Sequence, residues 1–257
     1  MAISQPVFCP SPGLTFSAHA VTVGDSTVTV GTDEFRQLDI LSIDCFPLTR
    51  FAESASYTEH EQRLLNRAIV AADQICVTIP EPPPLRGRSD WLRGLVDTSV
   101  PKPGWVWIDS VESISDVLVG KGLRSNAPDY PHPDTIRTQR PANRPEIGLT
   151  IGVANPVRCQ GAADRWLVLT CGGDELIVSL VDCYCDSATY GPYEASWNAM
   201  AKYRDTLAIT LPRPESSIDW IATLKPGSEH AGWLWLDAEL TLNEYLVAEG
   251  FSKREPG

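Results

Sequence analysis

The chain has 257 residues, a formal net charge of −12 and a hydrophobic content of 43%. This length suits one large domain or two domains of ordinary size, and the apolar content is sufficient for packed cores. Proteins that bind nucleic acid normally carry a basic surface, because neutralising phosphates supplies most of their affinity, so the acidic composition argues against that class. No run of about 18 apolar residues occurs, so we expect no membrane-spanning helix.

The N-terminal sequence and the seven cysteines bear on the cellular compartment. The first residues, MAISQPVFCPSPG, lack the basic stretch and apolar core of a secretory signal, so we expect no classical secretion. The cysteines are odd in number and lack the paired spacing of a zinc motif, which favours reduced, buried thiols. We therefore expect an intracellular protein, either soluble or within a virion or organelle assembly, that makes no membrane contact.

The first half of the chain alternates strand-like and helix-like patterns. Valines that alternate with threonines predict a half-buried hairpin, and apolar residues three and four positions apart predict an amphipathic helix. Thr58 and Glu61 have the spacing of a capping box, which would begin that helix. The expected elements, in order, are an irregular arm (1–14), a hairpin that turns at 24–26, a third strand that ends at Asp44, the helix (58–73), a strand (75–79), a strand with the sequence GWVWID (104–109) and a helix (113–121).

A proline-rich segment over 126–146 leads into a second series of the same elements. It contains Arg137, Arg140 and Arg144, with no acidic residue among them. Its many prolines are typical of an extended, semi-rigid linker. The second series consists of a hairpin with strands over 151–159 and 166–170, a third strand (176–181), a helix (193–205), a strand (207–211), a strand with the sequence GWLWLD (232–237) and a helix (241–249).

Two short motifs recur in the same order and at similar spacing. An Ile/Val-Asp-Cys sequence ends the third strand of each series, at Asp44 and at Asp182. The second motif is the pair of GW[VL]W[IL]D strands. Such self-similarity indicates an internal duplication. It predicts two domains, over 15–125 and 147–257, in which the two aspartates occupy equivalent positions.

Several stretches of the second series match the pattern of a known family. They are Val181-Asp182, the sequence GPYEAS at 191–196 and the closing sequence LNEYLVAEGF at 242–251, which has a shorter counterpart at 117–123. Together with the order of the elements, they resemble the staphylococcal-nuclease-like (thermonuclease) family. The resemblance implies an α+β fold that is mainly β, with two tandem OB-fold barrels of five strands each and packed helices.

The resemblance also implies a calcium-dependent nuclease site, of which this sequence keeps little. In the family, carboxylates hold calcium, a glutamate activates water and two arginines clamp the phosphate. One family aspartate is kept, as Asp44 and Asp182, but a single carboxylate is far short of a calcium shell. We therefore expect no catalytic residue, no metal site and no cofactor, with residual calcium binding as the alternative. At the other family positions stand Ser26 for the first calcium ligand, Pro47 and Cys185 for the glutamate, Asp39 and Ile177 for the first arginine, and Lys102 and His230 near the second, with Arg93 as a rival.

Three groups of residues have both a structural and a functional interpretation. An aspartate at a strand end can cap the next turn by accepting backbone N–H bonds. The repeated tryptophans alternate along a strand, so each pair shares one face. That face is either packed in the core or, through Trp105 and Trp233, a surface that stacks bases or binds peptides. The linker arginines are either a solvated connector or a binding site for an acidic partner.

We therefore expect a non-catalytic tandem nuclease-like protein that acts as a binding, scaffold or structural component of a larger assembly. In large members of the family, repeats that have lost catalytic residues serve as interaction platforms. The alternatives are a calcium-dependent phosphodiesterase with a rearranged site and a single-stranded nucleic-acid-binding protein. We expect protein partners, and we expect Arg137, Arg140 and Arg144 to contact protein, within the chain or outside it, rather than nucleic acid.

Overall fold

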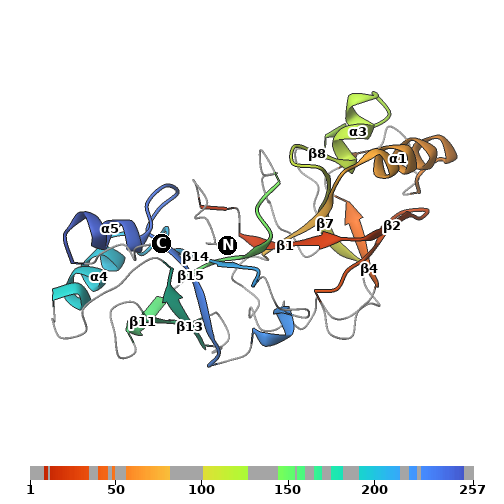
Figure 1. The fold of residues 1–257 in the computed structure, drawn as a ribbon. Helices are drawn as coiled ribbons and strands as arrows, with labels where there is room; N and C mark the ends of the chain where they lie inside the picture. Colours follow the sequence, from red (N-terminus) through yellow and green to blue (C-terminus); the bar gives the residue numbers. More distant parts are fainter. Residues whose placement is uncertain are drawn as a thin grey trace.

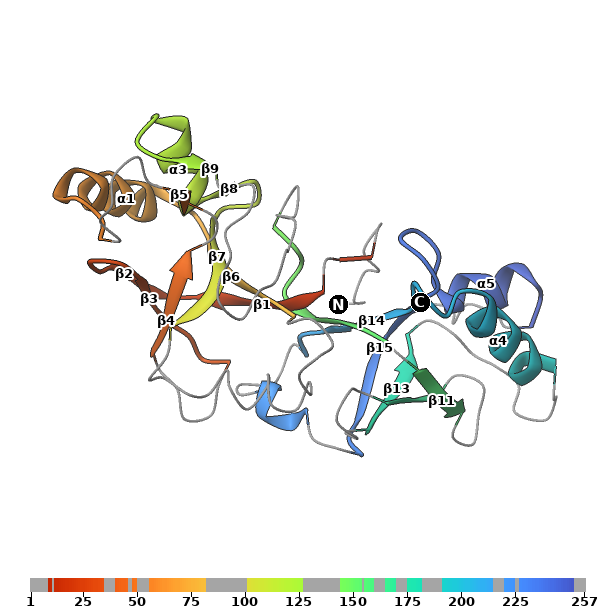
Figure 2. The same cartoon turned by 180° about the vertical axis from the view of Figure 1, so that it is seen from behind.

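The chain folds into a mixed α+β structure that is mainly β (Figure 1). Thirteen strands join in one sheet, in which most neighbouring strands are antiparallel. Within the described residues there are four α-helices, and they lie in two pairs at opposite ends of the molecule (Figures 1 and 2). The computed structural model describes residues 9–10, 12–34, 40–45, 48–49, 56–81, 101–126, 144–153, 155–159, 165–169, 175–181, 191–214, 220–224 and 227–251.

The elements of the first half follow the predicted order. Alternating β-branched residues form the hairpin of β2 and β3, and the predicted capping box between Thr58 and Glu61 begins α1. A second capping box, between Ser113 and Asp116, begins α3. The bounds are β1 (Gly13–Ala18), β2 (Ala20–Val23), β3 (Val28–Gly31), β4 (Ile40–Cys45), β5 (Leu48–Thr49), α1 (Glu59–Ala71), β6 (Ile75–Pro80), β7 (Lys102–Ile108), β8 (Glu112–Ser113), α3 (Ile114–Gly120) and β9 (Ser125–Asn126).

The elements of the second half repeat this series. A capping box between Thr241 and Glu244 begins its last helix, as in α3. Both of these helices are followed by a glycine with positive φ, Gly122 at 65° and Gly250 at 73°, which favours the left-handed backbone that ends a helix. The bounds are β10 (Gly148–Gly152), β11 (Asn155–Cys159), β12 (Arg165–Leu169), β13 (Glu175–Leu180), α4 (Gly191–Lys202), β14 (Ala208–Pro212), the 3₁₀ helix η1 (Trp220–Thr223), β15 (Glu229–Trp235) and α5 (Leu242–Ala248).

The two halves have the same strand order, which supports the internal duplication. The path through the first half is β2-β3-β4-β7-β6-β1, and the path through the second is β11-β12-β13-β15-β14-β10. In each path one pair is parallel, β4 with β7 and β13 with β15, and the other pairs are antiparallel. Chain order also places α1 before β6 and α4 before β14.

Strands β1 and β10 pair with each other and so join the two halves into one sheet. Leu14 lies opposite Leu149, and the glycine and threonine that flank each leucine face each other across the pair. The predicted division into two domains with a linker between them did not include this junction. The predicted arm over 1–14 was also too long, because β1 begins at Gly13, where it pairs with both β6 and β10.

Gly104 and Gly232 occupy equivalent positions in β7 and β15. A Cβ atom at Gly104 would lie 2.8 Å from the backbone oxygen of Thr78, and one at Gly232 would lie 2.6 Å from that of Thr210. Only glycine allows the neighbouring strand to approach so closely. The two glycines therefore provide a structural reference for aligning the halves.

Asp44 and Asp182 are not at equivalent positions, so that prediction was wrong. Cys45 lies opposite the first of these glycines, and Leu180 lies opposite the second. The residue before Leu180 is Ser179, which therefore takes the place of Asp44. Asp182 follows β13 and lies outside the described residues. A three-residue motif does not determine strand register, which the close contact at the glycine decides here.

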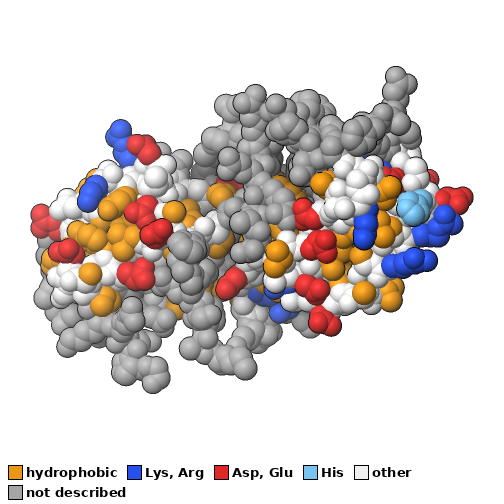
Figure 3. All heavy atoms as spheres, turned by 90° about the horizontal axis from the view of Figure 1, so that it is seen from above, with side chains coloured by type: hydrophobic (Ala, Val, Ile, Leu, Met, Phe, Trp, Pro, Cys, Tyr) orange, Lys and Arg blue, Asp and Glu red, His pale blue; other side chains and the backbone are white. Residues whose placement is uncertain are grey.

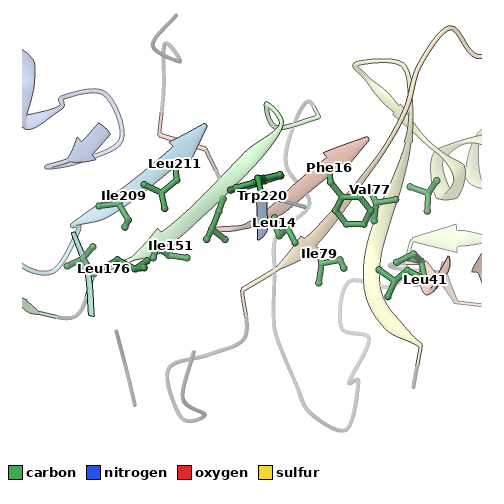
Figure 4. Close-up of a cluster of buried hydrophobic side chains, with 14 of the residues drawn as sticks. Leu14, Phe16, Leu41, Val77, Ile79, Ile151, Leu176, Ile209, Leu211 and Trp220 are labelled. Atoms are coloured by element: carbon green, nitrogen blue, oxygen red, sulfur yellow. The ribbon is translucent and has the colours of Figure 1, made fainter. Parts of the chain in front are cut away.

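One apolar core runs through both halves (Figure 4). Trp220 of η1, which is 1% exposed, lies between the labelled side chains of the two halves in this view. The halves are therefore joined by shared apolar packing as well as by paired strands. The labelled core residues are Leu14, Phe16, Leu41, Val77 and Ile79 from the first half and Ile151, Leu176, Ile209, Leu211 and Trp220 from the second.

Candidate functional site

A buried, hydrogen-bonded set of one tryptophan and two threonines occurs in each half. In the first half, Trp107 Nε1 donates to Thr78 Oγ1 at 2.9 Å, and Thr78 Oγ1 shares a second hydrogen bond of 2.9 Å with Thr15 Oγ1. This arrangement satisfies the polar atom of a fully buried indole and ties three strands together. The second half repeats it with Trp235, Thr210 and Thr150, at 2.9 and 3.0 Å.

Trp105 and Trp233 are also buried, which corrects the hypothesis that they form a binding surface. Their exposed fractions are 2% and 1%, so neither ring is available to stack a base or bind a peptide. They form two small clusters, together with Trp107 and Trp235, that are separate from the main core. The intervening Val106 belongs to the main core, so the tryptophans lie on the opposite face of the strand.

Each tryptophan cluster is covered by the segment that precedes the first strand of the other half. Ile147, just before β10, packs on the first-half cluster, and Cys9, before β1, packs on the second-half cluster. Cys9 N donates to Ala238 O at 2.8 Å, and Arg144 N donates to Ser110 O at 2.8 Å. These two backbone hydrogen bonds are equivalent, because donors and acceptors occupy matching positions in the two halves. We call the described residues of 9–12 (9, 10 and 12) and the segment 144–147 the crossing arms.

Arg144 binds residues of the first half and so makes a contact within the chain. Its Nη1 donates to Gln74 Oε1 at 2.6 Å and to Cys76 Sγ at 3.2 Å. Burial raises the pKa of the Cys76 thiol, and the neighbouring guanidinium opposes that shift. The other two linker arginines, Arg137 and Arg140, lie outside the described residues, so the hypothesis that they bind a partner remains a prediction.

Two polar contacts also join the halves. Glu34 forms an ion pair with Arg213, whose Nε lies 2.7 Å from Glu34 Oε1, and the glutamate side chain is 3% exposed. Glu81 Oε2 accepts a hydrogen bond from Gly152 N at 2.9 Å. Glu81 and Arg213 occupy equivalent positions, each directly after the proline that ends β6 or β14. Breaking the ion pair would leave a buried charge without its partner, which is costly.

The thiol of Cys9, in the first crossing arm, is unreactive at neutral pH. Burial, together with the nearby Asp237 carboxylate, raises the pKa of the Cys9 thiol to about 12. Its Sγ lies 3.6 Å from Pro10 O, within reach of a weak hydrogen bond. The thiol is therefore protonated at neutral pH and acts in packing, since the thiolate is the reactive form.

Lys102 and His230, which the resemblance places near the second nuclease arginine, occupy matching positions in the two halves. Lys102 lies opposite Ile43 in the first half, and His230 lies opposite Val178 in the second. Asp44 follows directly on the same strand, opposite Pro103. The register therefore brings Asp44 next to the position of Lys102, and Asp182 lies outside the described residues.

His230 is a poor substitute for a phosphate-binding arginine. Burial lowers the pKa of its imidazole, partly opposed by a hydrogen bond to the backbone of Thr223. Its Nε2 lies 2.8 Å from Ser228 Oγ. At neutral pH the ring is therefore neutral and lacks the positive charge that stabilises a reacting phosphate. Within the described residues, no three His, Cys, Asp or Glu side chains lie close enough together to hold a metal ion.

A buried ion pair anchors the end of the first half to α1. Arg124 Nε and Nη2 donate to Glu61 Oε1 and Oε2 at 2.5 and 2.9 Å, and both residues are 5% exposed. The guanidinium also lies 4.6 Å from the ring centre of Tyr57. Hydrogen bonding to Arg124 lowers the pKa of Glu61 to about 2, so the carboxylate is charged at neutral pH. These contacts hold the end of the first half against the helix.

Acidic residues outnumber basic ones in this chain, 33 to 21. Figure 3 shows carboxylates over both halves, whereas a group of basic side chains lies at the end of the molecule formed by the first half. Arg63 and Arg67 lie on the exposed side of helix α1 in that half. Within the described residues, no helix combines the length and apolar character that crossing a membrane requires.

Neither protein-family models nor curated protein sequences give a match to this chain. The class of the protein is therefore defined by its fold alone. It is a mainly β, α+β protein in which two repeated units share one sheet and one apolar core.

The residues that build the junction were missed by sequence analysis. A third repeated motif, Gly-Leu-Thr at 13–15 and 148–150, marks the strands that pair. A fourth, V-T-I-P at 77–80 and I-T-L-P at 209–212, supplies the buried threonine and the proline before each crossing contact. Both motifs are short and apolar, so they are easily taken for ordinary strand sequence.

Proposed function

We propose that this protein is a non-catalytic scaffold or structural component of a larger protein assembly. We further propose that it is built from two tandem OB-fold barrels of the staphylococcal-nuclease type. The observation that carries the proposal is the fixed arrangement of the two repeated units, which share strands, core and crossing arms. Such a unit holds its surfaces at a constant spacing, so little conformational freedom is lost when partners bind.

The strand order supports the OB-fold part of the proposal. An OB-fold is a five-stranded Greek-key barrel. In the first half, β1 and β2 are separated by His19 alone and stand at the two ends of the path β2-β3-β4-β7-β6-β1. If they are one bent strand, the path closes on itself with five strands. The second half has the same path, with β10 and β11 at its ends.

The chemistry of the family positions supports the absence of catalysis. Ser179 takes the place of Asp44, so the two halves do not share even the one aspartate that their sequences suggested. A neutral imidazole at His230 provides no clamp for a phosphate. Loss of one electrostatic or acid–base contributor costs roughly 10²–10⁴ in rate, so several losses together leave nothing above background.

Two experiments test this proposal. Purified protein incubated with calcium and single-stranded DNA or RNA is expected to leave the substrate intact. Cleavage that disappears in an Asp44→Ala variant would instead establish a calcium-dependent phosphodiesterase. Affinity capture of the tagged chain from its native source, after cross-linking, is expected to recover protein partners in constant proportion to the chain. Recovery of the chain alone would contradict a scaffold role.

The nucleic-acid alternative has its own test. The acidic composition and the internal contact of Arg144 favour protein partners. Changing Arg137, Arg140 and Arg144 to serine together is expected to alter partner binding or the seating of the crossing arm, with both halves still folded. Micromolar RNA binding with a steep salt dependence, abolished by the triple change, would favour the alternative.

The free thiols within the described residues, Cys9, Cys45 and Cys76, support an intracellular location.

A further inference from the structure

The contacts at the junction are related by an approximate two-fold axis. The pairing of β1 with β10 places Leu14 opposite Leu149 and each Gly-Leu-Thr segment antiparallel to the other. A rotation that exchanges the two leucines also exchanges the flanking glycines and threonines. An isologous interface between two copies of one protein has this form, because the same patch is used on both sides.

The crossing arms obey the same symmetry. The donors of the two crossing backbone bonds, Cys9 and Arg144, each lie four residues before the glycine that begins β1 or β10. Their acceptors, Ala238 and Ser110, each directly follow a GW[VL]W[IL]D strand. Each half therefore supplies an arm to its neighbour and receives one on its tryptophan cluster, as in dimers that exchange N-terminal segments.

Two polar contacts also cross the junction, although their partners are not related by the two-fold axis. Arg213 reaches Glu34, and Glu81 reaches the backbone of Gly152, from equivalent positions after β14 and β6. All these contacts join residues before position 127 to residues after position 143. None of them needs the chain to be continuous between those positions.

We infer that the junction is a complete protein–protein interface of the homodimer type, and that each half of this chain is the specific binding partner of the other. The paired strands, two crossing arms, an ion pair with the buried Glu34 and the shared core hold the halves together without the intervening linker. Within the intact chain, residues 127–143 raise the local concentration of the halves but do not create their association. This inference does not depend on the proposed scaffold function.

The test separates the two halves covalently in the full-length protein. A recognition sequence for a specific protease is inserted at either of two points within 127–143, and the uncut variant must unfold at the same temperature as the unmodified chain. After complete cleavage at about 10 µM, a concentration at which a sub-micromolar complex stays assembled, the fragments are expected to elute together with the mass of the intact chain. Fragments that elute separately, or that aggregate once cut, at both insertion points would overturn the inference.

A junction variant shows whether the crossing contacts carry the association. In the cleaved protein, Glu81→Gln combined with Arg213→Gln is expected to weaken association at least tenfold. The matched control changes Glu59 and Arg63, an exposed pair on α1 at 3.7 Å, to glutamine and should leave association unchanged. Equal effects of the two double variants, or no effect of the junction variant, would show that the fragments associate through other surfaces.

Discussion

Replacing Thr210 by valine removes the acceptor that the buried Trp235 indole uses. The indole nitrogen lies 2.9 Å from Thr210 Oγ1, and the two residues are 0% and 5% exposed respectively. Valine has nearly the shape of threonine, so packing is largely retained and the change isolates the hydroxyl group. The substitution also removes the 3.0 Å hydrogen bond to Thr150 Oγ1.

The cost follows from leaving buried donors without a partner. An unsatisfied buried polar group costs about 1–3 kcal/mol. Because the indole N–H and the Thr150 hydroxyl both lose a partner, we expect the free energy of unfolding to fall by about 2–3 kcal/mol. For a chain of this size, 1 kcal/mol corresponds to roughly 2–4 °C, so the melting temperature should fall by about 4–12 °C.

The assay is urea unfolding followed by tryptophan fluorescence and circular dichroism, with melting as a second measure. The internal duplication provides a replicate: Thr78→Val removes the equivalent acceptor of Trp107 and should cost a similar amount. It also provides a control, because Thr22 is exposed on β2 and Thr22→Val should change stability by no more than about 0.5 kcal/mol.

A double-mutant cycle decides whether the hydrogen bond itself is responsible. Thr210→Val is measured again in a Trp235→Phe background, where no indole N–H remains to be satisfied. We expect the threonine substitution to cost about 1 kcal/mol less there. An equal cost in both backgrounds would mean that the Trp235–Thr210 bond contributes nothing, and the argument from buried polar groups would fail.

Three further predictions concern single contacts, each measured by urea or thermal unfolding. Arg124 lowers the pKa of Glu61 to about 2 from its ordinary value of 4.5, so the stabilisation is complete above the unfolded-state pKa and is lost as the pH falls toward 2. Glu61→Gln should therefore lower the free energy of unfolding by about 3 kcal/mol at pH 7 and by about half of that at pH 3. A cost independent of pH would contradict this. Gly232→Ala should destabilise the protein by about 2 kcal/mol or more because the new Cβ would meet a backbone oxygen at 2.6 Å. Gly120→Ala is the control: no atom lies within 4 Å of that site at the end of α3, so the change should be neutral or stabilise by up to about 1 kcal/mol. Comparable losses at both glycines would refute the expected steric clash. Arg144→Ser should lower the free energy of unfolding by about 1 kcal/mol through its lost bond to Gln74. The control is Arg204→Ser at an exposed position. If Arg144→Ser costs less than this control, Arg144 does not hold the crossing arm.

Local patterns in the sequence determined the elements and their order. Helix α1 begins where Thr58 and Glu61 predict a capping box, and the strands containing the repeated tryptophans lie where their motif predicts. These features depend on residues a few positions apart, whose interactions are the same in any fold. The duplication could be recognised for the same reason, since repeated local patterns do not require knowledge of the fold.

The tertiary structure decided the register of the strands and what packs against each of their faces. The Asp-Cys motifs suggested that Asp44 matches Asp182, but the close approach at Gly104 and Gly232 shifts the match to Ser179. A strand can slide by whole residues without changing its local propensity, so only its neighbours determine its register. A sequence shows which tryptophans share a face, but it does not show what covers that face.

The junction depended most on the tertiary structure. Its contacts join residues that are distant in the sequence, and two of them, Leu14 with Leu149 and Glu34 with Arg213, join residues more than a hundred positions apart. The sequence contained the necessary pieces, including two copies of Gly-Leu-Thr, but several other strands of this chain are equally apolar. Which strand edges meet depends on which edges the rest of the fold leaves unpaired, and that is known only when both halves are assembled.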